Sequence, residues 1–234
     1  MFGPAEAGHY KIVPFGALGD IHGDFDSVHH IMARHPEVPF WVCVGDLADA
    51  DGQYHAVETP LYFIKGNNEN FDTIAAGALP ASLRFLDNAT VTVLDGVRIA
   101  GLGGTFAPTW YDTRAAELPH PRKGSARATE LADKRRHFVR EEVERIKRLE
   151  HLDLFLSHEA PRPYRVRGGR GPDAGKTAIN EVLAAARPRL HLFGHHHEYS
   201  DQMRQGVRSI GLDVVARSYL LIDPAMLAPE LVKR

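Results

Sequence analysis

The order of hydrophobic and polar residues predicts a chain in which short strands alternate with helices. Short apolar runs that end at Gly, Pro, Asn or Asp are typical of strands, and longer stretches with apolar residues three and four apart are typical of helices. We expect strands over residues 11–18, 40–44, 61–64, 91–94, 97–101, 152–156, 189–193 and 218–222. This alternation favours an α/β fold or a sandwich of two β-sheets flanked by helices.

Helices are expected over residues 25–34, 128–149 and 176–186. In the longest of them, hydrophobic residues recur at intervals of three, four and seven positions, with Lys, Arg and Glu between them. These residues are Leu131, Phe138, Val139, Val143, Ile146 and Leu149. The pattern predicts an amphipathic helix that packs one face and leaves its charged face in solvent.

Two long loops have unusual compositions. Residues 108–125 include Trp110 and Tyr111, and residues 161–175 contain several arginines among Gly and Pro. The arginines are Arg162, Arg165, Arg167 and Arg170. Loops of this length inside a compact domain are often functional.

The composition fits one sizeable domain or two small ones, since 44% of the 234 residues are hydrophobic. The sequence shows no internal repeat and no change of composition that marks a domain boundary. We therefore expect a single domain over residues 1–234, with an insert of loop and helix at about 107–150.

Net charge and cysteine content limit which partners and which cellular compartment are expected. The net charge of -2 predicts no strong overall attraction to nucleic acid or to an anionic membrane, although local basic clusters can still act. A single cysteine, Cys43, excludes an intramolecular disulfide. No apolar run has the length of a membrane span, and the first residues lack the pattern of a signal peptide. We expect a soluble, cytoplasmic protein with no membrane partner.

Residues with metal-ligand chemistry follow five of the predicted strands. Each run ends in Gly or Ser and then in Asp20 and His22 (GDIHGD), Asp46 (VGD), Asn67 (GNNE), His158 (LSHE), or His195 and His197 (GHHHE). Any one Asp after Gly is as often a helix cap or turn residue, and a lone His is usually not a ligand. Their joint occurrence at strand ends favours a ligand site, because clefts at the carboxyl ends of strands are where such sheets bind ligands.

The spacing of these residues suits a pair of cations. The two carboxylate oxygens of Asp46 can bridge two ions, and Asn67 supplies a neutral amide oxygen. His195 and His197 are two positions apart, so on extended backbone they point to the same side. The mixture of imidazole, carboxylate and amide suits Mn²⁺, Fe or Zn²⁺ better than Ca²⁺.

At these residues the sequence resembles the calcineurin-like metallophosphoesterases, whose motifs appear here in the same order between residues 19 and 197. The resemblance implies a sandwich of two sheets with a dinuclear metal site, manganese being the first expectation and iron or zinc the alternatives. By motif, the first ion belongs to Asp20, His22, Asp46 and His197, and the second to Asp46, Asn67, His158 and His195. The segments VRIAGLGGTF and DLFLSHEAPR resemble the RNA lariat debranching enzymes most.

One position departs from the family pattern. The third motif usually reads Gly-Asn-His, and that histidine faces the substrate and can protonate the leaving group; here Asn68 stands in its place. An amide donates hydrogen bonds but does not act as a general acid. His196 is expected to point away from the metals, and Asp24 to cap the following helix or to hold a ligand histidine.

The predicted reaction is metal-assisted hydrolysis of a phosphate ester, with two ions about 3.5 to 4 Å apart activating water and clamping phosphate oxygens. The arginines of residues 161–175 would orient the anion. Trp110 and Tyr111 would either stack on a base or pack as a lid. We expect a phosphodiesterase acting on nucleotides or nucleic acid. The alternatives are a phosphomonoesterase and a binding module that kept the fold without catalysis.

Overall fold

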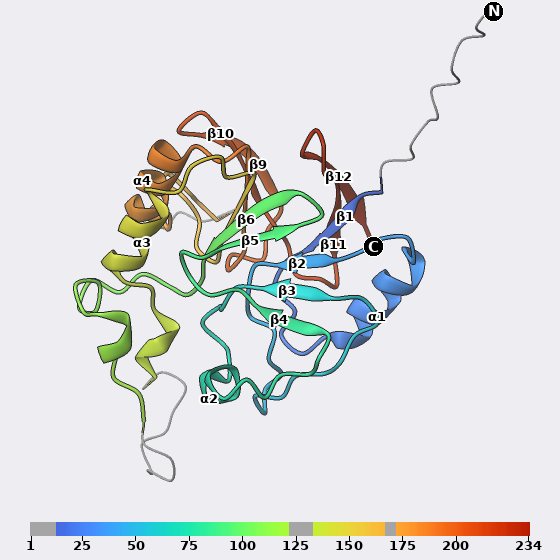
Figure 1. The fold of residues 1–234 in the computed structure, drawn as a ribbon, viewed down its shortest axis with the longest axis horizontal. Helices are drawn as coiled ribbons and strands as arrows, with labels where there is room; N and C mark the ends of the chain where they lie inside the picture. Colours follow the sequence, from blue (N-terminus) through green and yellow to red (C-terminus); the bar gives the residue numbers. More distant parts are fainter. Residues whose placement is uncertain (1–12, 122–132, 167–171) are drawn as a thin grey trace, which may run out of the picture.

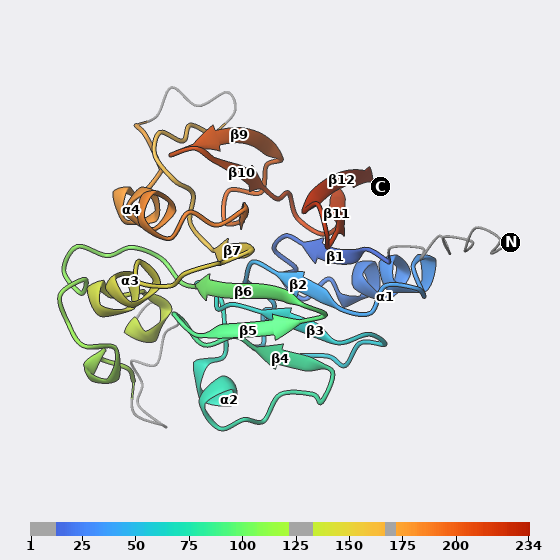
Figure 2. The same ribbon diagram turned by 45° about the horizontal axis from the view of Figure 1, so that its top comes forward.

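The computed structural model describes residues 13–121, 133–166 and 172–234. Two six-stranded sheets pack face to face with helices on their outer sides, so the predicted α/β sandwich is confirmed (Figures 1 and 2). The first sheet has the order β12-β11-β1-β2-β3-β4 and the second β5-β6-β7-β8-β10-β9. In each sheet four neighbouring strands are parallel, and the others pair antiparallel at the edges.

The strands of the first sheet are β1 (Phe15–Leu18), β2 (Trp41–Cys43), β3 (Leu61–Phe63), β4 (Leu83–Phe85), β11 (Ser218–Asp223) and β12 (Ala228–Lys233). Those of the second are β5 (Val91–Leu94), β6 (Val97–Leu102), β7 (Leu154–Ser157), β8 (Leu190–Phe193), β9 (Ser200–Arg204) and β10 (Val207–Gly211). Within the described residues, no helix has the length and apolar character needed to cross a membrane.

Successive side chains of a strand point to opposite faces of its sheet, so each strand contributes to two apolar layers. In β2, Val42 points into the apolar layer between the two sheets, whereas Trp41 and Cys43 point to the opposite face. There they meet Val28 and Ile31 of helix α1 (Phe25–Arg34). The strand is apolar throughout because both of its faces are buried.

The outer face of the second sheet is covered by α3 (Arg140–Ile146) and α4 (Thr177–Ala186), seen together beside that sheet in Figure 1. Phe155 of β7 packs in one cluster with Val143 and Ile146 of α3 and with Val182 and Leu183 of α4. These helices therefore bury one apolar face each, as their spacing predicts.

Helix α1 begins and ends where the sequence predicts. Asp24 caps it, since a carboxylate oxygen of Asp24 accepts a hydrogen bond from the backbone N–H of Ser27 at 3.1 Å. Helix α4 begins one residue later than predicted. A short helix, α2 (Phe71–Ala75), was not predicted, although Asn70 caps it through a hydrogen bond from the N–H of Thr73.

The prediction of one helix over residues 128–149 is wrong. Of the part that the structure describes, Lys134–Arg136 form a 3₁₀ turn, the following residues are extended, and α3 is only seven residues long. His137 pairs with Thr105 in a short parallel bridge, and the carboxylate of Glu142 accepts a hydrogen bond from the N–H of Val139 at 2.9 Å. These contacts hold the chain extended up to the start of α3.

Strands β4, β9, β10 and β12 were not predicted. Strand β12 and strand β9 lie at the edges of their sheets, with alternate residues exposed, and β4 has only three residues. Short or half-exposed strands carry a weak hydrophobic signal. The first predicted strand begins at Phe15, and its residues 11 and 12 lie outside the described part of the chain.

Candidate metal centre

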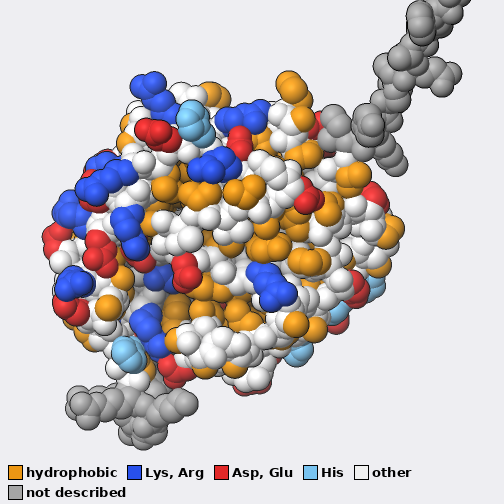
Figure 3. Space-filling model, viewed as in Figure 1, with side chains coloured by type: hydrophobic (Ala, Val, Ile, Leu, Met, Phe, Trp, Pro, Cys, Tyr) orange, Lys and Arg blue, Asp and Glu red, His pale blue; other side chains and the backbone are white. Residues whose placement is uncertain are grey.

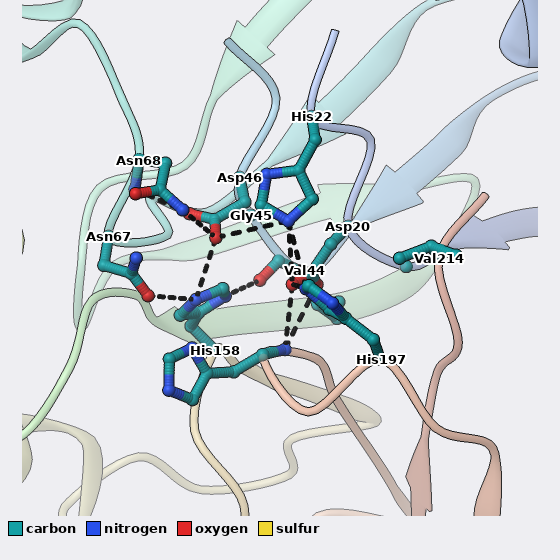
Figure 4. Close-up of polar contacts among 12 residues, drawn as sticks. Asp20, His22, Val44, Gly45, Asp46, Asn67, Asn68, His158, His197 and Val214 are labelled. Carbon is teal, nitrogen blue, oxygen red and sulfur yellow. Dashed lines mark hydrogen bonds and ion pairs between the residues drawn. The ribbon is translucent and has the colours of Figure 1, made fainter. Parts of the chain in front are cut away.

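The predicted ligands lie just beyond the carboxyl ends of five strands. Parallel pairing sets these ends level: Leu18 of β1 lies opposite Cys43 of β2, Cys43 lies opposite Phe63 of β3, and Ser157 of β7 lies opposite Phe193 of β8. The first sheet thus contributes Asp20, His22, Asp46 and Asn67, and the second contributes His158, His195 and His197. Figure 4 shows side chains from both sheets turned toward one another.

Among the described residues, two groups of side chains have their donor atoms within 4.8 Å of one another. They are Asp20 with His22 and His197, and Asp20 with Asp46 and His158. In the first group, the Nε2 atom of His197 lies 3.0 Å from Oδ2 of Asp20 and 3.0 Å from Nε2 of His22. Neither the two imidazoles nor the carboxylate needs to move far to face one cation.

Asp46, a member of the second group, also lies close to His22 of the first. Its Oδ2 atom is 3.8 Å from Nε2 of His22 and 3.6 Å from Nε2 of His158. The Oδ1 atom of Asn67 is 3.1 Å from the same nitrogen of His158. Asp46 therefore lies near donors of both groups, and Asp20 belongs to both groups.

His195 lies beside the centre but in neither group. Its ring stands 4.9 Å from the ring of His158, and its backbone N–H donates to both carboxylate oxygens of Asp20, at 3.2 and 3.1 Å. The expectation that His195 and His197 project from extended backbone is wrong, because their φ angles are 69° and 52°. A turn after β8, rather than strand alternation, directs the two rings.

Four candidate ligands have the left-handed backbone conformation that residues other than Gly rarely adopt. They are His22 (φ 48°), Asp46 (55°), His195 (69°) and His197 (52°). Such conformations cost free energy and cluster at active sites and ligand clamps, where the surrounding structure enforces them. The observed strain points to a functional role for these turns.

Glycine residues let the carboxylates approach the backbone. A Cβ atom at Gly66 would lie 1.9 Å from Oδ1 of Asp46, and one at Gly194 would lie 2.3 Å from Oδ1 of Asp20. Any side chain at these positions would therefore displace a carboxylate. This explains why a Gly precedes the donors of the third and fifth motifs.

The buried charges of the centre favour a cation. Burial acts to raise the pKa of Asp20, but the hydrogen bond from His197 and the charge of His158 outweigh it and lower that pKa. Burial acts to lower the pKa of His158, but the charges of Asp46 and Asp20 raise it above its usual value. Burial lowers the pKa of His195 to about 3, so this ring stays neutral, which is the form that binds metals.

Asn68 is bonded to Asp46 through both its main chain and its side chain. The backbone N–H donates to Oδ1 of Asp46 at 2.7 Å, and Nδ2 donates to Oδ2 at 2.9 Å (Figure 4). Asn68 therefore orients the carboxylate of Asp46.

Sequence reasoning missed Glu69, which joins the loops after β2 and β3. Its carboxylate accepts hydrogen bonds from the N–H groups of Leu47 and Gly66, at 3.1 and 3.2 Å, and from the hydroxyl of Tyr54 at 2.8 Å. Burial and the charge of Asp46 raise the pKa of Glu69 to about 7. The signal available in the sequence was the position of this acid, directly after Asn67 and Asn68.

The ring of His196 lies beside that of His195, with ring centres 5.0 Å apart. Its ring stacks on Tyr164 at 4.5 Å, and burial lowers its pKa to about 4. The ring thus forms part of the packing beneath residues 161–166.

Little of the Tyr111 ring is free to stack on a base. This side chain is 8% exposed and packs against Phe106 and Phe138, with the guanidinium of Arg140 over its ring. These contacts are compatible with the alternative role of Tyr111, packing as a lid. Trp110 beside it is partly exposed.

The arginines of the second loop are only partly described. Arg162 donates from Nε to Oδ2 of Asp173 at 2.9 Å, which occupies part of its guanidinium. Arg165 is exposed, whereas Arg167 and Arg170 lie outside the described residues. Leu131 and residues 128–132 of the predicted long helix lie outside them as well.

A cavity of about 610 Å³ adjoins the candidate centre at His22 and Asn68. Its described lining residues come from the loops after β2 and β3, from the start of α2, and from Pro121, Asp133 and Arg135. The contribution of residues 133–135, far along the chain, was not predicted.

Comparison with solved structures finds the same fold at low sequence identity. The protein TT1561 of Thermus thermophilus is 14% identical, with a TM-score of 0.62, over 95% of this chain and 99% of that one. A dimetal phosphatase from Danio rerio is 11% identical, with a TM-score of 0.56, over 95% and 99% of the two chains. An archaeal phosphodiesterase is 8% identical, with a TM-score of 0.51, over 94% and 99%.

A search among curated proteins finds no match. The family model described as calcineurin-like phosphoesterase, by contrast, matches residues 13–199, which include every strand end that carries a candidate ligand. The chain belongs to the calcineurin-like phosphoesterase family.

Proposed function

We propose that the protein is a phosphoester hydrolase that works with two divalent cations. The observation that carries this proposal is the convergence of the buried side chains of Asp20, Asp46 and His158 with the exposed imidazoles of His22 and His197 at the carboxyl edges of both sheets. Carboxylate and imidazole donors fit manganese, iron or zinc. Such ions, when bound, make water more acidic and neutralise charge on the phosphate.

Each side chain has a part in this proposal. Asp20, His22, Asp46 and His197 would hold one cation, and Asp46, Asn67, His158 and His195 the other. Asn68 keeps Asp46 oriented through its two hydrogen bonds. His195 would need a small rotation to reach a cation, since its ring now lies against that of His158.

Protonation of the leaving group is the step for which no acid has been assigned. The amide of Asn68 faces Asp46 and has no titratable proton. We therefore expect the enzyme to prefer esters whose leaving groups depart without protonation, such as phenols.

We further propose that the substrates are phosphodiesters, with nucleotides or nucleic acid as the first class to examine. The exposed Arg165, the partly exposed Trp110 and the resemblance to lariat debranching enzymes support this class. The burial of Tyr111 and the ion pair of Arg162 with Asp173 weaken it. In addition, Figure 3 shows the basic side chains around α3 and α4 interspersed with acidic ones, rather than forming a basic stripe.

Monoester hydrolysis is the second candidate reaction. The fold is shared with a dimetal phosphatase from Danio rerio as well as with an archaeal phosphodiesterase, so it suits both reactions. A non-catalytic binding module is disfavoured, because buried carboxylates such as Asp20 and Asp46 cost desolvation free energy that a scaffold has no need to bear.

Metal analysis combined with two hydrolysis assays tests the proposal. The protein is loaded with Mn²⁺, Fe²⁺ or Zn²⁺, its metal content is measured, and bis(p-nitrophenyl) phosphate and p-nitrophenyl phosphate are offered. We expect bound metal and faster turnover of the diester. Asp46→Asn should lose both metal and turnover, whereas the control Asp95→Asn, at the exposed turn between β5 and β6, should keep them. A protein that neither binds metal nor hydrolyses either ester is a binding module instead.

A further inference from the structure

The loop between β10 and β11 lies against the turns that carry Asp20 and His197. The backbone N–H of Val215 donates to the carbonyl oxygen of Asp20 at 3.1 Å. A Cβ atom at Gly19 would lie 2.0 Å from the carbonyl oxygen of Asp213, so the loop packs directly on the turn after β1. This loop is therefore held at a fixed place relative to the candidate donors.

Arg217 of this loop reaches the backbone of a candidate ligand. Its Nη1 atom donates to the carbonyl oxygen of His197 at 3.4 Å and to Oδ1 of Asp213 at 3.2 Å. The same Oδ1 atom accepts a hydrogen bond from the N–H of Val214 at 2.8 Å, which fixes the carboxylate. The side chain of Arg217 is nevertheless 66% exposed. The guanidinium therefore stands at the rim of the centre and faces solvent.

One edge of this guanidinium is not engaged by the protein. Within the part of the chain that the structure describes, the Nε and Nη2 atoms of Arg217 make no hydrogen bond. These two donors are parallel and match two oxygens of a phosphate. The same two atoms of Arg135, at the cavity, already donate to Asp133 and Asp72. Arg217 is thus better placed than Arg135 to bind an anion.

Arg217 and the cavity lie on different sides of the donors. The cavity adjoins His22 and Asn68, whereas Arg217 contacts His197. In Figure 4, Val214 lies across the group of donors from Asn68. A phosphodiester whose phosphate is held at the centre has two substituents, so one can enter the cavity while the other passes Arg217.

Two further basic residues lie at the same edge of the first sheet. Strand β11 is antiparallel to β1 and therefore begins at the edge where β1 ends, and β12, antiparallel to β11, ends there too. Lys233 and Arg234 are exposed at this end of β12, and the N–H of Arg234 donates to the carbonyl oxygen of Arg217 at 2.9 Å. The acid of the neighbouring loop, Asp213, offsets part of this charge. A strand that passes Arg217 would continue toward Lys233 and Arg234.

We propose that Arg217 binds a second phosphate of the substrate, next to the one that is hydrolysed. This proposal rests on the proposed function and narrows its substrates to nucleotides or strands in which the retained nucleoside carries a phosphate of its own. The reacting phosphate would lie at the cations, the leaving group in the cavity, and the second phosphate at the edge of Arg217 formed by Nε and Nη2. Such a phosphate either ends a nucleotide or links it to the next nucleotide of a strand, and both forms present anionic oxygens.

Three chromogenic esters test this proposal. Each is thymidine 5′-(p-nitrophenyl phosphate), with a hydroxyl, a methyl phosphate or a phosphate at the 3′ position. All release the same p-nitrophenol, so differences in kcat/KM report on the 3′ group. In protein loaded with Mn²⁺ at low salt, we expect a 3′ phosphate group to raise kcat/KM about fivefold, toward the upper end of what an exposed ion pair contributes. The advantage should fall as salt is added.

The two phosphorylated esters also distinguish the two sources of a second phosphate. The methyl phosphate represents the linkage of a strand, and the phosphate represents a terminal nucleotide. The ester with the larger advantage shows which form the site takes. If neither ester exceeds the 3′-hydroxyl ester, the proposal is overturned.

Substitutions then assign the advantage to Arg217. In Arg217→Gln the ratio should move toward one, and in Arg217→Lys, which keeps the charge without the two parallel donors, it should be intermediate. Arg189→Gln is the matched control, because Arg189 likewise donates to a carboxylate, that of Asp153 at 3.2 Å, and to the carbonyl oxygen of Ala225 at 2.8 Å. Arg189 lies at the opposite end of β8 from His195, so this variant should keep the natural ratio. An unchanged ratio in Arg217→Gln contradicts the proposal.

A binding measurement separates this proposal from the proposed function. Isothermal titration calorimetry in the presence of Mn²⁺ compares thymidine 3′,5′-bisphosphate with thymidine 5′-phosphate. We expect the bisphosphate to bind more tightly, and Arg217→Gln to remove the difference. If no ester is hydrolysed but this difference is found, the hydrolase proposal fails and the role of Arg217 stands. If esters are hydrolysed but neither rate nor affinity responds to the 3′ phosphate, the role of Arg217 fails and the hydrolase proposal stands.

Discussion

Asn68 holds the carboxylate of Asp46 at the position where the family usually has a proton donor. Replacing it by His would exchange a hydrogen bond to Asp46 for a titratable group facing the leaving oxygen. We expect Asn68→His to raise the turnover of alkyl esters relative to p-nitrophenyl esters by about a hundredfold, at the low end of what a positioned general acid supplies.

The measurement is the ratio of kcat for a methyl ester and an aryl ester of the same phosphate. Asn68→Ala serves as the control, because it removes the bond to Asp46 without adding an acid, and it should lower both rates and leave the ratio alone. A ratio in Asn68→His equal to that of the natural protein would show that position 68 does not reach the leaving oxygen.

Lys65 connects β3, whose end carries Asn67, to the wall of the cavity. Its Nζ atom donates to the carbonyl oxygens of Arg135 and His137, at 2.8 and 2.9 Å, and its own carbonyl accepts from Gly104 at 2.7 Å. We expect Lys65→Met to lower the free energy of unfolding by about 2 kcal/mol, because two carbonyls lose their donor. Urea unfolding checks this value.

A control at the end of the last strand completes that experiment. Lys233→Met removes an exposed amine at the end of β12 and should change the free energy of unfolding little. If Lys65→Met also retains full stability, the segment of residues 133–137 must be held in place by its other contacts.

The contrast between α1 and α3 shows what sequence patterns determine about an element. In α1, the capping residue Asp24, the apolar spacing and the helix boundaries all agree, so local information suffices. Before α3, residues with the same apolar spacing, such as Phe138 and Val139, are extended. They are buried without being helical. The bridge from His137 to Thr105 that keeps them extended joins residues distant in sequence, and no local pattern reports it.

The candidate centre likewise has features that the sequence predicts and features that it does not. Its donors were named from motifs, because each follows an apolar run and the carboxyl ends of parallel strands meet. The left-handed turns at His195 and His197, the hydrogen bonds between Asn68 and Asp46, and the acids Asp49 and Asp133 of the cavity depend on contacts between separate loops. Such contacts are decided by the packed molecule rather than by neighbouring residues.

A buried histidine makes the stability of the whole molecule depend on pH. His191 lies in β8 between the hydroxyls of Ser157 and Ser209, at 2.8 and 3.1 Å, and burial lowers its pKa to about 3. Unfolded, it titrates near pH 6.5. Between these values only the unfolded chain takes up the proton, so stability is retained above about pH 6.5 and falls as the pH drops, by at most about 1.4 kcal/mol per unit.

Urea unfolding at several pH values tests this contribution. His191→Gln should show a shallower loss of stability between about pH 6.5 and pH 5 than the natural protein, because the group that titrates has been removed. His30→Gln, at an exposed position of α1, is the matched control and should retain the natural slope. Equal slopes in all three proteins would contradict the role of His191.

Removal of metal should also act on the molecule as a whole. A cation that binds only the folded chain stabilises it by RT ln(1 + [M]/Kd), about 2.7 kcal/mol at a hundredfold excess over Kd. We expect Mn²⁺ to raise the unfolding midpoint and a chelator to lower it, as followed by thermal denaturation. In Asp46→Asn the midpoint should no longer respond to Mn²⁺; a natural protein whose midpoint is the same with and without cations would contradict the proposed centre.

The division of the donors between the two sheets has a consequence for affinity. Asp20, His22 and Asp46 belong to one sheet and His158 and His197 to the other, so neither sheet offers a complete set. The distance between the two halves is fixed by the thickness of the apolar layer that separates the sheets. Trimming that layer far from any donor, for example by Leu154→Ala, should therefore weaken cation affinity as well as stability. The packing of the interior would then set the distance between the candidate ligands of the two sheets.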